Sequence, residues 1–416
     1  MRILKLTPRL EKQILSRRAQ SDDEAQRTAA EIVSDVRRRG DAALLAWTKK
    51  LDDPETRLDN LWIPQTEIRA AERRVSSEFL RAVRQAARNL QRVAEQQLPK
   101  PWSIEVQPGV AISQRISPIE SIGCYIPGGN ASLVSTLLMT AVPAQAAGVG
   151  RIIAVCPKPN NELLAVAQFL GLSEVACVGG AQAIAALAYG TKSVPRVEKI
   201  FGPGNKYVTA AKQLVSAECA IDLPAGPTEA IVLAERGNAR FIAADLLAQA
   251  EHAKDAASFF VTTSAALARE VKREVQWQLA ELPAGMANFS TVRSGAILLA
   301  KSLREACDFV NRFAPEHLSL PSDSAALLQQ IRSSGTIFIG PWAAQPLGDY
   351  VTGSSHVLPT AGWARRRGGL SAADFVKCIT VQTISRNGFL GLANSAEAFA
   401  ESEGLLAHRN AVRVRR

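Results

Sequence analysis

The chain alternates short runs of aliphatic and β-branched residues with helical stretches, and this alternation constrains its fold more than any other feature. One series comprises RIIAVC (151–156), EVACVG (174–179) and EKIFGPG (198–204). A second series comprises AIVLAE (230–235), SFFVTTS (258–264), GAILLA (295–300) and GTIFIG (335–340). Repeated β-then-α units predict parallel sheets covered by helices. We therefore expect an α/β fold with two Rossmann-like, doubly wound sheets.

Both ends of the chain carry helical patterns. Residues 1–100 have apolar positions at helical spacing and predict a helical N-terminal region. The segment from 371 onward is also predicted to be helical, and it is too short and polar to form a large core alone. The predicted parts are an N-terminal helical arm (1–20), a first Rossmann-like domain (21–124 plus 236–370), a second Rossmann-like domain (125–235) and a small helical C-terminal segment (371–416).

The composition restricts where the protein works and what it binds. The 416 residues are 47% hydrophobic, and neither a secretory signal nor an uninterrupted membrane-spanning run is apparent. We therefore expect a cytoplasmic protein without a membrane partner. The net charge of +10 raises the question of nucleic acid, but most arginines alternate with acids on helical surfaces. Only residues 365–367 and 409–416 are locally basic, so a nucleic-acid partner is not expected.

The six cysteines contain no CxxC pair, which argues against a disulfide framework and a thiolate zinc site. We expect them to be buried thiols.

Three glycine-rich strings fall at the ends of predicted strands. They are YIPGGN (125–130), VGGAQ (178–182) and FGPGN (201–205). None matches a phosphate loop or the dinucleotide fingerprint, and each alone could be a tight turn. Together they lie at the edge where α/β sheets bind ligands, and each ends in an amide residue, namely Asn130, Gln182 or Asn205. The combination favours a ligand site.

All four histidines lie in polar contexts, and three of them have a candidate partner. Gln249 and His252 would share one face of a helix and could meet one metal ion. Asp349 precedes His356, and Glu403 precedes His408. Imidazole nitrogen and carboxylate oxygen are suitable zinc donors, although glutamine is an infrequent ligand and no HExxH helix is present. From spacing alone, these residues could form a metal site or could be polar residues that bind no metal.

The fourth histidine stands in FAPEHLSLP (313–321), where Glu316 and His317 lie side by side between two prolines. An exposed loop pair without chemistry is the simpler reading of such a dipeptide.

Ordered motifs over most of the chain resemble the histidinol dehydrogenase family. The resemblance is carried by GCYIPGGNASLVSTLLMTAVPAQAAG, VGGAQAIAALAYGT, KIFGPGNKYV, IDLPAGPTE, DLLAQAEH, APEHL, GDYVTGSSHVLPT, GLSAADF and AHRNAV. It implies an intertwined homodimer with one Zn²⁺ per subunit and NAD as cofactor. The implied zinc ligands are Gln249, His252, Asp349 and His408, the last of them donated, together with Glu403, by the partner subunit.

The resemblance also implies the remaining site residues. NAD contacts fall on Tyr125, Gln182 and Asn205. Substrate contacts fall on Thr228, Gln249, His252, His317, Asp349, His356, Glu403 and His408. The reaction implied is oxidation of L-histidinol to L-histidine through bound L-histidinaldehyde with two NAD. Glu316 and His317 would be the catalytic pair: the imidazole suits proton abstraction at cytoplasmic pH, and the acid would activate water.

Two other chemistries stay open at this point. One is a relative on the same fold that oxidises another primary alcohol, such as a sulfonated diol, to the acid. The other is a covalent route through a thiohemiacetal on Cys124 or Cys156. The chain departs from the family pattern at Thr228, commonly serine, at Ser355, often asparagine, and in the basic run 365–367. These departures bear on substrate fit.

Overall fold

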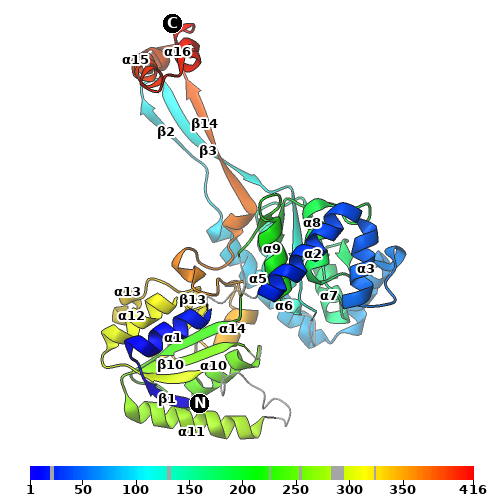
Figure 1. Ribbon diagram of the computed structural model, residues 1–416, viewed down its shortest axis with the longest axis vertical. Coiled ribbons are helices and arrows are strands. Elements are labelled where there is room, and N and C mark those ends of the chain that lie inside the picture. The colour runs from blue at the N-terminus through cyan, green and yellow to red at the C-terminus, as the bar shows by residue number, and fades with distance from the viewer. Residues whose placement is uncertain (19–22, 129–132, 224–225, 253–254, 283–294, 323–324) are drawn as a thin grey trace.

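The computed structural model describes residues 1–18, 23–128, 133–223, 226–252, 255–282, 295–322 and 325–416. Within these ranges the chain forms two parallel sheets covered by helices and a separate antiparallel arm (Figure 1). The mixed α/β prediction is confirmed at this level. No described helix is long and apolar enough to cross a bilayer.

The larger sheet has six strands, and every neighbouring pair in it is parallel. Its spatial order is β1 (Arg2–Lys5), β11 (Ala296–Leu299), β10 (Ala257–Thr262), β9 (Glu229–Leu233), β12 (His317–Leu320) and β13 (Thr336–Ile339). The helices that accompany it are α1 (Pro8–Arg18), α10 (Ala239–Glu251), α11 (Ala265–Glu281), α12 (Leu303–Phe313), α13 (Ala325–Gln330) and α14 (Gln345–Tyr350). One apolar core joins this sheet to α12 and a second joins it to α10 and α11.

The smaller sheet has five parallel strands. Its order is β6 (Val175–Ala176), β5 (Arg151–Val155), β4 (Ser121–Tyr125), β7 (Lys199–Phe201) and β8 (Ala220–Ile221). One core packs α4 (Gln65–Ala71), α5 (Ser77–Gln97), α6 (Val134–Ala146) and α7 (Asn161–Phe169) against it. The other core contains α2 (Asp23–Arg39), α3 (Asp41–Leu51), α8 (Gly180–Tyr189) and α9 (Lys206–Val215).

The third sheet is antiparallel and projects from the body as an arm (Figure 1). It consists of β2 (Trp102–Gln107), β3 (Val110–Pro118) and β14 (Val376–Ile384), with β3 in the middle. Two helices, α15 (Arg386–Ser402) and α16 (Leu406–Arg413), cap the far end of the arm. The C-terminus therefore lies far from both parallel sheets within its own chain.

The predicted domain boundaries are wrong in two respects. Residues 23–97 were assigned with 236–370, but their helices pack on the five-stranded sheet formed between residues 121 and 221. The predicted arm at 1–20 begins instead with a strand, β1, paired with β11. An amphipathic pattern predicts that a helix buries one face, but it does not specify which distant sheet covers that face.

The helical prediction for the C-terminal segment is correct for α15 and α16 and wrong before them. Only Ala372–Phe375 forms a short helical turn, and Val376–Ile384 is a strand. Its sequence, VKCITVQTI, is rich in β-branched residues, which favour strands. Pairing with the whole of β3 then completes the arm.

Candidate functional site

A cavity of 490 Å³ lies between the two parallel sheets. Helices α5 and α6 and the loop Gly202–Gly204 form the wall on the side of the five-stranded sheet. The opposite wall carries the polar residues Thr228, His252, Glu316, His317, Asp349 and His356. Five of these six were singled out as substrate contacts and the sixth, Glu316, as catalytic.

Glu316 is a buried carboxylate, so the reading of an exposed loop pair is wrong. Helix α12 ends at Phe313; its C-cap residue Ala314 adopts a left-handed conformation with φ of 50°, and Pro315 prevents the helix from continuing. The Oε2 atom of Glu316 accepts hydrogen bonds from the Thr228 hydroxyl at 2.5 Å and the Glu229 amide at 2.9 Å. Burial raises the pKa of Glu316, and the neighbouring His317 and these hydrogen bonds oppose that rise.

His317, the first residue of β12, is 3% exposed and lies between two carboxylates. Its Nδ1 atom is 3.7 Å from Oε2 of Glu316, and its Nε2 atom is 3.4 Å from Oδ1 of Asp349. The ring stacks on Phe338 with centroids 5.9 Å apart. Burial alone would lower the pKa of His317, but the two carboxylates outweigh it and raise the pKa above its usual value. The site therefore favours a proton on this ring.

Asp349 and His356 are held together. The Nδ1 atom of His356 lies 2.9 Å from the backbone oxygen of Asp349, and its Nε2 atom lies 3.2 Å from the hydroxyl of Thr136 on α6. Burial would raise the pKa of Asp349, but the hydrogen bond and charge of His317 lower it. Burial lowers the pKa of His356, so that ring is neutral.

Gln249 and His252 come from the end of α10, as their spacing predicted. The amide of buried Gln249 donates to the Thr228 hydroxyl, and His252 is the exposed C-cap residue. The Nδ1 atom of His252 lies 3.2 Å from the backbone oxygen of Ala248, which only accepts, so Nε2 keeps a free lone pair. A backbone carbonyl behind an imidazole is a usual support for a metal ligand.

The described residues of one chain contain no group of three His, Cys, Asp or Glu able to hold a metal ion. His252 and Asp349 line the same cavity, whereas His408 lies on α16 and Glu403 at the end of α15, both exposed at the tip of the arm (Figure 1). Nitrogen and oxygen donors of Gln249, His252 and Asp349 suit Zn²⁺, and a further ligand would have to come from outside the chain's own body.

The three predicted cofactor residues lie at the carboxyl edge of the five-stranded sheet. Tyr125 ends β4, and its hydroxyl accepts from the Gly180 amide at 3.2 Å. Gln182 is in the first turn of α8, and Asn205 caps α9 by accepting from two backbone amides. Asn130 lies outside the described residues.

Two residues that hydrogen-bond predicted site residues were not singled out in the sequence. They are Asp52, bonded to Gln182, and Thr136, bonded to His356. Neither stands in a pattern that would have revealed it.

Comparison with known proteins identifies the family. The family model for histidinol dehydrogenase matches residues 15–416. The chain is 44% identical to histidinol dehydrogenase of Methanosarcina mazei, covering 93% of this chain and 91% of that protein. It is 44% identical to that of Aquifex aeolicus, covering 99% and 97%. The crystal structure of histidinol dehydrogenase from Elizabethkingia anophelis matches with a TM-score of 0.94 at 36% identity, covering 100% and 98%.

The chain belongs to the histidinol dehydrogenase family.

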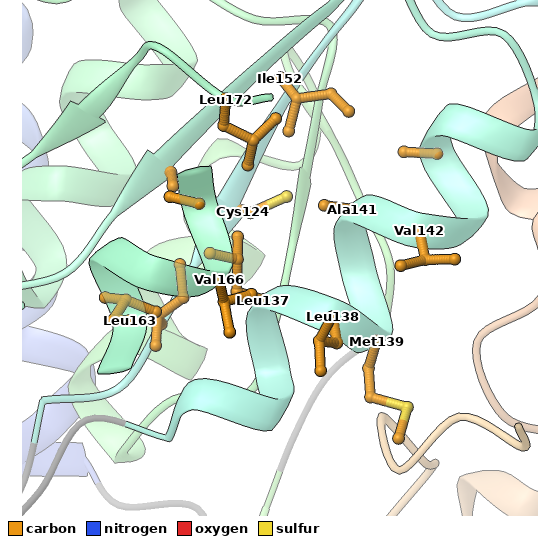
Figure 2. Close-up of a cluster of buried hydrophobic side chains, with 14 of the residues drawn as sticks. Cys124, Leu137, Leu138, Met139, Ala141, Val142, Ile152, Leu163, Val166 and Leu172 are labelled. Carbon is orange, nitrogen blue, oxygen red and sulfur yellow. The ribbon is translucent and has the colours of Figure 1, made fainter. Parts of the chain in front are cut away.

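The cysteine route is not supported in this member of the histidinol dehydrogenase family. Cys124 and Cys156 are both fully buried. Figure 2 shows Cys124 among apolar side chains that include Leu137, Ala141 and Val166. Burial raises the pKa of the Cys124 thiol to about 12, so the reactive thiolate is strongly disfavoured.

The departures from the usual histidinol dehydrogenase motifs have structural partners here. Thr228 keeps the hydroxyl that joins Glu316 to Gln249. In the basic run, Arg365 donates to the backbone oxygen of Arg312 at 2.5 Å, and Arg367 bonds the backbone of Asp222 and the carboxylate of Asp374. Arg366 lies over the ring of Trp363. Ser355 accepts from the Val357 amide at 3.2 Å.

Proposed function

We propose that the protein is a zinc-dependent histidinol dehydrogenase of the cytoplasm that oxidises L-histidinol to L-histidine through bound L-histidinaldehyde, using two NAD in succession. The observation that carries this proposal is the buried Glu316–His317 pair on the wall of a cavity between two parallel sheets. Family membership supports the substrate, since the relatives carry the name histidinol dehydrogenase.

His317 acts as the base in both oxidations. The neutral form of its ring takes the proton, and Nε2 lies 3.4 Å from Oδ1 of Asp349. In the first step the substrate hydroxyl gives its proton to this neutral ring while the carbon gives a hydride to NAD. The neighbouring carboxylates, which raise the pKa of His317, stabilise the imidazolium that forms.

Glu316 acts on the water that adds to the aldehyde. A carboxylate whose pKa is raised by burial is a better proton acceptor than one in water. Thr228 and the Glu229 amide hold one of its oxygens in place. Once His317 has released its first proton to solvent, the hydrated aldehyde gives a proton to the neutral ring and a second hydride to a second NAD, which yields the acid.

Gln249, His252 and Asp349 would hold the metal with His408, and Glu403 would contact the substrate. When bound, Zn²⁺ would supply a Lewis acid that orients the nitrogen atoms of the substrate. Because His408 and Glu403 lie at the arm tip, a second copy of the chain would supply them in a homodimer. Tyr125, Gln182 and Asn205 would contact NAD at the carboxyl edge of the five-stranded sheet.

The test is to incubate the zinc-loaded protein with L-histidinol and excess NAD, and to count NADH per histidinol consumed. Two NADH per substrate, with histidine as product, is the expected result. A protein that binds zinc and NAD but does not turn over histidinol would contradict the proposed substrate and favour the related enzymes that oxidise other primary alcohols. One NADH per substrate with released aldehyde would contradict the role of Glu316.

A further inference from the structure

The side chain of Asp52 joins helix α3 to the start of helix α8. Asp52 is the C-cap residue of α3. Its Oδ2 atom accepts hydrogen bonds from the Gly179 amide and from Nε2 of Gln182, both at 3.0 Å. Gly179 is the N-cap residue of α8, so the carboxylate also meets the positive end of that helix, where a negative charge is stabilised.

The first amides of α8 are engaged within the chain. The Gly179 amide bonds Asp52, and the Gly180 amide bonds the hydroxyl of Tyr125 at 3.2 Å. These two amides are therefore not free to bind the phosphates of a dinucleotide. The side chains of Tyr125 and Gln182 are buried, and both are cofactor contacts in the proposed function.

Asp52 fixes which end of the Gln182 amide is available. A carboxylate oxygen only accepts, so the amide nitrogen of Gln182 must face Asp52, and Oε1 must point elsewhere. That oxygen is buried and has no hydrogen-bond partner among the described residues. A Cβ atom at Gly180 would lie 2.4 Å from Oε1, so only glycine permits this placement. A buried acceptor without a donor is costly unless a ligand supplies one.

We infer that Asp52 is a positioning residue of the dinucleotide site, which holds Gln182 so that its amide oxygen accepts a hydrogen bond from a ribose hydroxyl or an amino group of the cofactor. The inference rests on the proposed function, because it takes NAD as the ligand at Gln182. Asp52 acts through Gln182 and the start of α8, and it does not touch the reacting atoms.

The experiment compares the unaltered protein with variants at Asp52, all full-length and zinc-loaded. Their affinity for NADH is measured by NADH fluorescence without histidinol. Asp52→Ala should weaken NADH binding about tenfold or more, because a hydrogen bond to a charged group is lost. The KM for NAD should rise in parallel, whereas kcat and the KM for histidinol should stay within about twofold. Asp52→Asn keeps an acceptor oxygen and should restore most of the affinity.

Asp53→Ala is the matched control, since it removes the neighbouring carboxylate, which accepts from the Glu55 amide at 3.0 Å. It should leave NADH affinity unchanged. If Asp52→Ala lowers the melting temperature, Asp52→Leu keeps the branched side-chain shape without an acceptor and should show the same selective loss.

Unchanged NADH affinity in Asp52→Ala and Asp52→Leu would overturn the inference, and so would an equal loss of NADH and histidinol binding. An unaltered protein that binds NADH but forms none from histidinol would refute the proposed substrate only. The comparison of NADH affinities would then still decide the role of Asp52.

Discussion

The Nε2 atom of His356 lies 3.2 Å from the hydroxyl oxygen of Thr136, and this contact joins the two sides of the cavity. Thr136 belongs to α6, which covers the five-stranded sheet, whereas His356 follows α14 beside the six-stranded sheet. The backbone oxygen of Asp349 only accepts, so Nδ1 of His356 carries the proton. Nε2 of this neutral ring then accepts from Thr136, and His356 is held from both sides.

Removing the Thr136 hydroxyl should therefore leave His356, and the Asp349 backbone that it bonds, less firmly positioned. We expect Thr136→Val, which keeps the side-chain shape, to lower kcat/KM for histidinol about tenfold, the cost of about one buried hydrogen bond. Thr136→Ser keeps the hydroxyl and should retain most of the activity. Steady-state kinetics of both variants measures the difference, and equal activity of the two would show that the bridge has no role in catalysis.

Glu316→Gln should separate the two oxidations. The neutral amide cannot take a proton from water, so oxidation of added histidinaldehyde should fall about 100-fold, while oxidation of histidinol to the aldehyde falls much less. Single-turnover measurement of each step with NAD distinguishes them. Thr228→Ser, which keeps the hydroxyl that bonds Glu316, is the control and should oxidise the aldehyde normally. Normal aldehyde oxidation by Glu316→Gln would disprove water activation by this carboxylate.

Donation of His408 by a second copy predicts complementation between two inactive variants. His408→Asn removes the metal ligand that the arm would donate, and His317→Asn removes the base in the body of the chain. In a mixed dimer one site would combine an intact body with an intact arm. Co-expression of both variants should therefore recover about a quarter of the unaltered activity, because about half of the dimers are mixed and each has one working site. Absence of any recovery in purified mixed dimers would contradict a shared site.

The sequence predicted the parallel sheets because they follow from local patterns, and the resemblance to a known family pointed to polar residues that converge in one cavity. Alternating β and α segments predict parallel strands wherever they lie, and the residues Glu316, His317, Asp349 and His356 do meet in one cavity. The spacing of Gln249 and His252 predicted that both belong to one helix, and they lie at the end of α10.

The features that the sequence missed depend on contacts between distant segments. Thr136 is 220 residues from His356, and Asp52 is 130 residues from Gln182. No periodicity or motif in one sequence links such pairs. The strand β14 was missed for a related reason: its partner β3 lies more than 250 residues earlier in the chain, and no local pattern links the two segments.

Asp245 should make stability depend on pH in a specific direction. Burial raises its pKa from 3.8 to about 6, although the Gln345 amide opposes that rise. The folded protein therefore binds this proton more tightly than the unfolded chain, and ionising Asp245 destabilises the fold as pH rises from about 4 to 6. Asp245→Asn keeps an acceptor for Gln345 and should raise the free energy of unfolding by ~1–2 kcal/mol at pH 7.

The same substitution should have little effect at pH 4, where Asp245 is protonated in the folded state. Urea unfolding at the two pH values measures the difference. A stabilisation of equal size at both pH values would mean that the charge of Asp245 is not its cause.

Lys212 and Asp222 form an ion pair whose side chains are 1% and 0% exposed, and the pair bonds both backbone polar groups of one residue, Gly202. The Lys212 ammonium donates to the Gly202 oxygen at 2.9 Å, and Asp222 accepts from the Gly202 amide at 2.8 Å. Gly202 has a φ of 116°, and a Cβ there would lie 2.1 Å from the backbone oxygen of Tyr125. The pair thus fixes the glycine loop that lines the cavity and leads into α9.

Lys212→Met should lower the free energy of unfolding by ~3–5 kcal/mol, because it leaves the Asp222 carboxylate buried without its counter-charge. Adding Asp222→Asn removes that charge and keeps an acceptor for the Gly202 amide, so the double variant should be more stable than Lys212→Met alone. Urea unfolding of the three proteins measures both differences. If the second substitution restored nothing, the loss would come from packing of the lysine side chain, and the buried charge would not be what makes the single variant unstable.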